Sequence, residues 1–315
     1  MKFRTISCLA LLVFATRADS WAAQAPNSAN IASLERGFEL GSKIGNCIVA
    51  RCQIFLGTII DEPSTRGDSV AVRVSEWVLK GTGGDELVRV PYEDHQGQSG
   101  GDGGGSAAAA WQYLEPRRGG IVTVAVGTEN GWGVRSGVPV LVTSSDQEGK
   151  TIRDLVDVSR RLSESPELLI ESCASLSRRP DPALAGYLFV HLTRGRPQGD
   201  RERSTMLLFQ MLTSPSVPQR ALDSVVFWLI LKYNGLPPSG RASLVSKFAA
   251  LSYHQNPQTA SLAIEAIRRF ASTDSSFAAK LPRNVLEEVR TAYRATIQRG
   301  VVGPDKLLET QFEVK

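Results

Sequence analysis

Apolar residues recur with one spacing in the first half of this sequence and with another in the second half. An all-β or an all-α fold does not accommodate both spacings. The stretch Val70–Ser75 alternates apolar with smaller or polar residues, the repeat of two that gives a β-strand one apolar face. After the polar run Ser144–Lys150 the repeat becomes 3.6, as in the helical pattern of Ala263–Phe270. The sequence therefore predicts a β domain over residues 26–145 and an α-helical domain over 151–300. Residues 301–315 are predicted as a C-terminal tail with one last helical turn.

Five strands are predicted in the first domain, with a short helix at Ser106–Leu114 between the third and the fourth. At Trp77 the alternation shifts by one residue, which a β-bulge explains. The stretch Glu93–Gly105 is rich in glycine and is predicted as an exposed loop. The strands are Cys52–Ile60, Val70–Leu79, Leu87–Val90, Ile121–Gly127 and Trp132–Thr143, the last interrupted at Ser136-Gly137.

This order of strands and helix resembles an OB-type barrel, a five-stranded, partly open β-barrel. More narrowly, Cys52–Thr143 resembles the netrin-like variant, through the strand Ile54–Ile60 and the segment Val70–Gly81. That variant occurs in tissue inhibitors of metalloproteases and in exported bacterial proteins. In the inhibitors a cysteine at the mature N-terminus coordinates the zinc of the target. Here the first cysteine after the predicted signal segment, Cys47, lies about twenty residues after the expected mature N-terminus. The resemblance therefore does not imply that this chain inhibits metalloproteases by the same mechanism.

The second half carries repeated helix-start signals. Asp181-Pro182 and Asn256-Pro257 each place a capping side chain before a proline at the first helical position. Ser216–Gln219 is a variant that could form a capping box. These starts are 35 and 40 residues apart, a spacing that resembles HEAT-like repeats. We expect roughly eight helices, of which the one with Val225–Leu231 is apolar all round and should be the most buried.

The N-terminal segment Met1–Ala25 has the pattern of a secretory signal peptide, with Lys2 and Arg4 before the apolar run Ile6–Ala15. The run is shorter than the ~20 apolar residues that a membrane span needs. A periplasmic or secreted location follows as an expectation. The formal charge of +4 falls to +2 without Lys2, Arg4, Arg17 and Asp19, and so small a charge argues against a nucleic-acid partner. The segment that follows, Pro26–Ile44, is interpreted as an N-terminal arm or a short helix.

An exported protein permits disulfides. Cys47 and Cys52 are five residues apart, so in an extended strand they would point to opposite faces. They form a disulfide only if Ile48–Arg51 turns, and otherwise they are two small buried residues near the start of a strand. Cys173 is predicted as an unpaired core residue of a helix. No second ligand pair accompanies the cysteines, so no metal or other cofactor is expected.

One stretch matches an enzyme motif. Gly97–Gly101 reads G-x-S-x-G around Ser99, with His95 nearby. The motif lies in the glycine-rich loop, where such matches arise by chance. His191 and His254 belong to the other domain, and the three histidines lack metal-site spacing.

The aromatic residues that could stack on bases sit mostly at core positions, which also argues against nucleic acid. They are Phe55, Trp77, Tyr92, Trp111 and Trp132. The leading hypothesis is an exported, non-enzymatic protein with a protein partner, because helix-pair arrays present extended surfaces. The alternatives are an exported hydrolase that uses Ser99, or carboxylates such as Asp94 and Asp102, and a netrin-like protease inhibitor.

Overall fold

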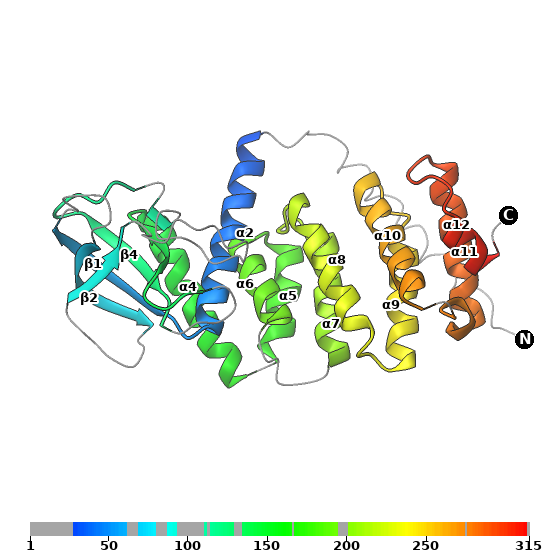
Figure 1. Cartoon of the computed structure of the whole chain (residues 1–315), viewed down its shortest axis with the longest axis horizontal. Coiled ribbons are helices and arrows are strands. Elements are labelled where there is room, and N and C mark those ends of the chain that lie inside the picture. Colours follow the sequence, from blue (N-terminus) through cyan, green and yellow to red (C-terminus); the bar gives the residue numbers. More distant parts are fainter. Residues whose placement is uncertain are drawn as a thin grey trace, which may run out of the picture. The chain divides into compact units, whose positions relative to one another are not determined.

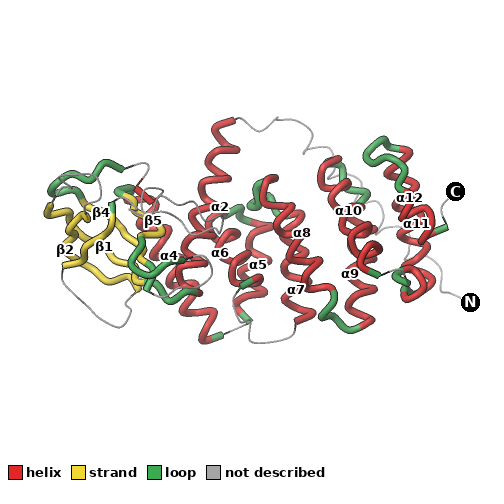
Figure 2. Tube along the Cα trace, in the orientation of Figure 1, coloured by secondary structure: helices red, strands yellow, loops and turns green. Residues whose placement is uncertain are grey.

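The computed structural model describes residues 28–61, 69–79, 87–92, 110–111, 114–128, 134–165, 167–194, 201–274 and 276–313. The chain divides into two compact units, Met1–Ser33 and Leu34–Lys315, and the sheet and the later helices belong to the second. Within this second unit, strands precede a long succession of helices (Figures 1 and 2). The predicted change from strands to helices is therefore present.

The five strands form one curled antiparallel sheet in the order β3-β2-β1-β4-β5. The predicted number of strands is confirmed, and the register between β1 and β2 shifts next to Trp77, where the sequence predicted a bulge. The predicted interruption at Ser136-Gly137 is present, because Gly137 has φ +75° and β5 begins after it at Pro139. The strands are β1 (Gln53–Asp61), β2 (Ser69–Leu79), β3 (Leu87–Pro91), β4 (Ile121–Val126) and β5 (Pro139–Thr143).

Strand β1 buries side chains on both faces of the sheet. Phe55 lies in a core of the sheet's own residues with Trp111, whose indole N–H donates to the carbonyl of Pro91 at 2.8 Å. The neighbouring Ile54 and, from β2, Val78 belong instead to the core that the helices share. The sheet thus continues into the helical core, and its aromatic side chains Phe55 and Trp111 are buried.

Helix α4 (Asp146–Glu164) follows the sheet directly. It begins five residues before the helical domain that was predicted from residue 151, because Ser145 caps it by accepting from the Glu148 backbone N–H. Ser145 and Glu148 have the spacing of a capping box, a signal within the polar run Ser144–Lys150 that the sequence interpretation missed. Arg160 of α4 then donates to the carbonyl of Val78 in β2 at 2.8 Å.

The later helices pack in succession, and several also contact the helix two places along: α5 with α7, α8 with α10, α9 with α11 and α10 with α12. This is a stack of helices in two layers. The helices are α5 (Leu168–Arg178), α6 (Pro182–Thr193), α7 (Arg201–Gln210), α8 (Gln219–Tyr233), α9 (Pro238–Leu251), α10 (Pro257–Thr273), α11 (Arg283–Gln298) and α12 (Lys306–Phe312), with 3-10 turns η2 (Met211–Thr213) and η3 (Ala278–Lys280).

Helices begin at all three predicted starts. Asp181 caps α6 and Asn256 caps α10, each with proline at the first helical position. The third signal, Ser216–Gln219, also precedes a helix, since α8 begins at Gln219, but the capping box that Ser216 could have formed is not made, because Pro218 precedes α8 and no side chain caps it. The Ser216 hydroxyl instead accepts from the backbone N–H of Asp181 at 3.0 Å and so links the loops that precede α6 and α8.

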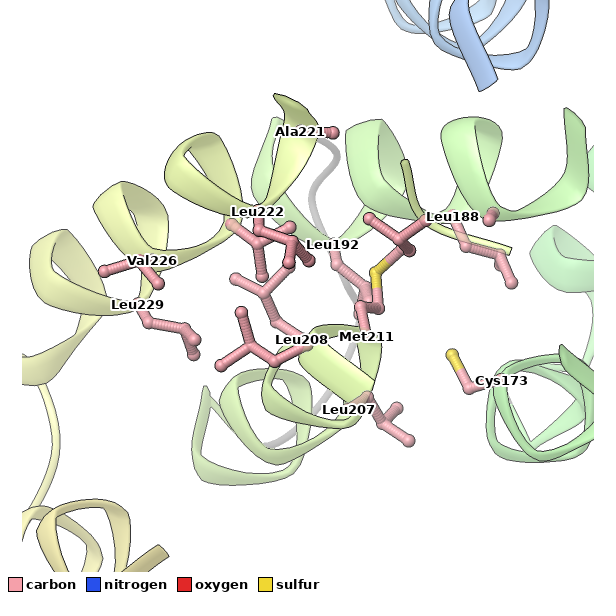
Figure 3. Close-up of a cluster of buried hydrophobic side chains, with 14 of the residues drawn as sticks. Cys173, Leu188, Leu192, Leu207, Leu208, Met211, Ala221, Leu222, Val226 and Leu229 are labelled. Atoms are coloured by element: carbon pink, nitrogen blue, oxygen red, sulfur yellow. The ribbon is translucent and has the colours of Figure 1, made fainter. Parts of the chain in front are cut away.

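The core of the stack is built from apolar side chains of neighbouring helices, and Figure 3 shows a cluster of them from α5 to α8. Cys173 lies in this cluster, as predicted for a core residue. The C-terminal tail predicted after residue 300 forms α12, and its Leu308 and Phe312 are buried in the same core. The tail is therefore an integral end of the stack.

Helix α8 is less buried than the sequence predicted. Val225, Val226 and Leu229 are buried, but Phe227 and Leu231 are 49% and 52% exposed. Hydrophobic residues on every face do not require neighbours on every face, and α8 packs mainly on α7, α10 and η2. The prediction that this helix is the most buried one is wrong, since α10 buries more of its residues.

The segment before the sheet forms a long helix, α2 (Ser28–Val49), rather than an arm or a short helix. From Leu34 on it belongs to the same unit as α6. At Gly41 a Cβ would lie 1.8 Å from the carbonyl oxygen of Ala183, and at Gly186 a Cβ would lie 2.0 Å from that of Phe38. The two helix backbones therefore touch where both lack side chains.

Replacing Gly41 with alanine should destabilise the protein. The added Cβ would overlap the α6 backbone, and overpacking of this kind costs about 1–3 kcal/mol, more than the ~1 kcal/mol that alanine gains in helix propensity. We expect Gly41→Ala to lower Tm by several degrees in a thermal melt followed by circular dichroism. Gly303→Ala is the control, because nothing lies within 4 Å of its Cβ position. Equal melting temperatures for both variants would contradict the close packing of α2 and α6.

Candidate functional site

The residues of the enzyme motif, His95, Ser99, Asp94 and Asp102, lie outside the described residues, as does the signal segment Met1–Ala25. The other two histidines have separate structural surroundings. His191 stacks on Tyr187 in α6, with ring centroids 6.0 Å apart, and burial lowers its pKa. His254 lies between α9 and α10, where its Nδ1 accepts from the Asn256 backbone N–H. Both thus have roles within the helical stack.

The structure joins Cys47, near the end of α2, to Cys52, just before β1, by a disulfide. Their Cα atoms are 5.1 Å apart, since the chain turns between them and Arg51 takes the left-handed conformation at φ 56°. Both cysteines are buried. Burial also raises the pKa of the Cys173 thiol to about 12, which keeps it in the unreactive thiol form at neutral pH.

No group of three or more potential metal-ligating side chains is found among the described residues. In the same part of the chain, no helix is both long and apolar enough to cross a membrane. Each buried side-chain polar atom described has a hydrogen-bond partner. The candidate site is therefore a surface feature and not a buried constellation of polar groups.

A groove of about 750 Å³ lies between α9 and α11, within the 300–1,000 Å³ range of ligand pockets. The lining residues follow the spacing i, i+3, i+4 and i+7 on each side, which places those within a helix on one of its faces; Tyr253 lies in the turn just after α9. The α9 wall is Ser246, Ala249, Ala250 and Tyr253, and the α11 wall is Asn284, Glu287, Glu288 and Thr291.

The two walls differ in chemistry. The α9 wall has small side chains and ends at Tyr253, which is 49% exposed. The α11 wall is polar and carries both carboxylates. Beneath the groove the helices contact each other and bury Phe248 and Val289 in the common core. The hollow therefore results from the small residues of α9, since the helices themselves are packed together.

Side-chain contacts fix how the two helices are aligned. The hydroxyl of Ser246 donates to Oε2 of Glu288, and Arg299, after α11, donates to the carbonyls of Ser252 and His254 at 3.0 and 2.9 Å. In these contacts the later residues of α9 meet the later residues of α11, so the two helices run parallel. Arg299 thereby ties the end of α11 to the corner that follows α9.

Comparison with known proteins finds no family model, no curated protein and no solved structure that matches this chain. The groove therefore has to be interpreted from its own residues. The sequence interpretation did not identify it. The sequence does contain two sets of residues at the spacing i, i+3, i+4, i+7, one with small side chains and one with two glutamates. That these two sets face each other depends on which helices are neighbours in the fold.

A thiol count tests the disulfide and the burial of Cys173. In the chain from Pro26 to Lys315, we expect a thiol reagent to modify no cysteine in the native protein at pH 8, because the one thiol is buried and its pKa is about 12. In denaturant one thiol per chain should react, and after reduction all three. Three reactive thiols in denaturant without reductant would show that Cys47 and Cys52 are not joined.

Removing the Arg299 side chain should loosen the end of the groove. Arg299→Ala loses two hydrogen bonds from a guanidinium to backbone carbonyls, and at this exposed position we expect a loss of about 1 kcal/mol in the free energy of unfolding. Urea denaturation measures the loss, and faster amide exchange in the last turn of α9 locates it. Arg294→Ala, an exposed arginine of the same helix, should change stability by less than about 0.5 kcal/mol. If both variants are equally stable, Arg299 does not tie the two helices together.

Proposed function

We propose that this chain is an exported, non-enzymatic protein that binds another protein through its helical stack. The observation that carries the proposal is the groove between α9 and α11, whose walls each follow about two turns of chain. Stacked helices of this kind present extended surfaces to partners. A groove open along two parallel helices accommodates a length of chain better than a small molecule, because it lacks a closed end to bury one.

The finer fold classes belong to the same proposal. One curled five-stranded sheet whose core includes Trp111 supports an OB-like barrel of the netrin-like kind. Layered helices with the repeated caps Asp181 and Asn256 support a HEAT-like array. The disulfide between Cys47 and Cys52 supports export to the periplasm or the medium, because disulfides persist in oxidising compartments.

The experiment is a pull-down with the chain from Pro26, tagged after Lys315, from an envelope extract of the source cells. We expect one stoichiometric partner, identified by mass spectrometry, that stays bound at moderate salt. The chain unfolded by reduction in urea and immobilised in the same way is the control, since it should lose the partner. If the native chain retains nothing beyond this control, the protein-binding proposal fails.

A further inference from the structure

We propose that the groove between α9 and α11 binds an extended, basic segment of the partner protein, with a lysine or arginine at Glu288 and an apolar residue at Tyr253. This inference rests on the proposed function and adds the chemistry of the partner. It follows from the room in the groove, the charge of one wall and the distance between the two anchor positions.

The room is sufficient for a single strand of chain. Ser246, Ala249 and Ala250 fill little of the space beside α11, and the hollow they leave measures about 750 Å³. An extended segment needs less room than a helix, which is 10–12 Å across with its side chains, and it exposes its side chains to both walls.

The charge of the groove selects a cation. Both ionisable groups of the α11 wall are carboxylates, and no lysine, arginine or histidine lines the groove. Glu287 already receives a hydrogen bond from Arg290 at 2.6 Å. Glu288 accepts from the neutral hydroxyl of Ser246, and among the described residues no basic side chain forms an ion pair with it. A carboxylate offers about four acceptor positions, so Glu288 can take a charged donor from a partner.

The two anchors lie about 10 Å apart along the helix axis. Ser246, which faces Glu288, and Tyr253 are seven residues apart. Tyr253 lies in the turn just after α9, where backbone hydrogen bonds from Ser252 to Phe248 and from Tyr253 to Ala250 continue the helical path, and each residue of an α-helix rises 1.5 Å. A polyproline II segment rises 3.1 Å per residue with three residues per turn, so side chains three positions apart share a face and are about 9 Å apart. The geometry therefore points to a basic residue and an apolar residue three positions apart, in a segment of this extended conformation.

Selection from a phage library of random peptides tests this inference on the chain from Pro26 to Lys315. Phage that also bind Ala250→Trp are removed first, because this substitution places a large ring in the groove at an exposed position. We expect the remaining peptides to be enriched in lysine or arginine with an apolar residue three positions away. Enrichment of acidic peptides, or of none, would overturn the inference.

The selected peptides are then synthesised with a fluorescent label and their affinity is measured by anisotropy. We expect Glu288→Gln to weaken binding about fivefold, as for the loss of one partly exposed ion pair, and Ala250→Trp to weaken it at least tenfold. The matched controls are Glu115→Gln, an exposed carboxylate paired with Arg117, and Ala174→Trp, an exposed alanine of α5. Equal binding by wild type and both groove variants would overturn the inference.

The outcomes separate this inference from the proposed function. If the Ala250→Trp chain still captures the partner from the envelope extract, the protein binds through another surface, and only the inference falls. If the native chain captures no partner but binds basic peptides in the groove, the groove chemistry stands and the protein-binding role loses its support. If the wild-type chain sediments as a dimer that Ala250→Trp dissociates, the occupant is a second copy and the inference falls.

Discussion

The contact between the backbones of α2 and α6 determines how the two halves of this chain are joined. The segment of α2 after Ser33 comes before the sheet in sequence, yet its Gly41 lies against Ala183, which follows the sheet by forty residues. Ile44 and Cys47 of α2 are buried in the core that the later helices share. The sheet is thus inserted between two helices that pack on each other, and the Cys47–Cys52 disulfide lies at the point where the chain leaves α2 for β1.

The strands could be predicted because a period of two reports local structure directly. Val70 and Val72 are buried in the sheet core, and Ala71 between them is buried as well. The bulge beside Trp77 was visible as a change of parity. Likewise Asp181 and Asn256 marked helix starts, because a cap is a contact within four residues. Features that depend only on a few neighbouring residues can be predicted from the sequence without knowledge of the fold.

What the sequence interpretation missed depends on distant neighbours. Gly37, Gly41 and Gly45 lower helix propensity, so the long α2 was predicted as an arm or a short helix, although glycines four residues apart also make one helix face that a second backbone can approach. Phe227 and Leu231 were predicted to be buried, and only the position of α7 and α10 shows that this face of α8 is uncovered. The groove was missed for the same reason, since Ser246 and Glu288 are 42 residues apart.

Small residues have opposite consequences at these two places. At Gly41 the partner backbone occupies the space that a side chain would take, so the small residue brings two helices into contact. Beside the exposed Ala250 the helices are already held together by Phe248 and Val289 beneath, and the space above remains open. A leucine at Ala250 could reach across to α11 and bury apolar surface, at about 25 cal/mol per Å². The groove lacks this stabilising contact. Apolar side chains in the groove would also interact poorly with the carboxylates of the opposite wall. A basic, partly apolar segment from another chain fits both walls, which is the physical reason to look for the function of this protein there.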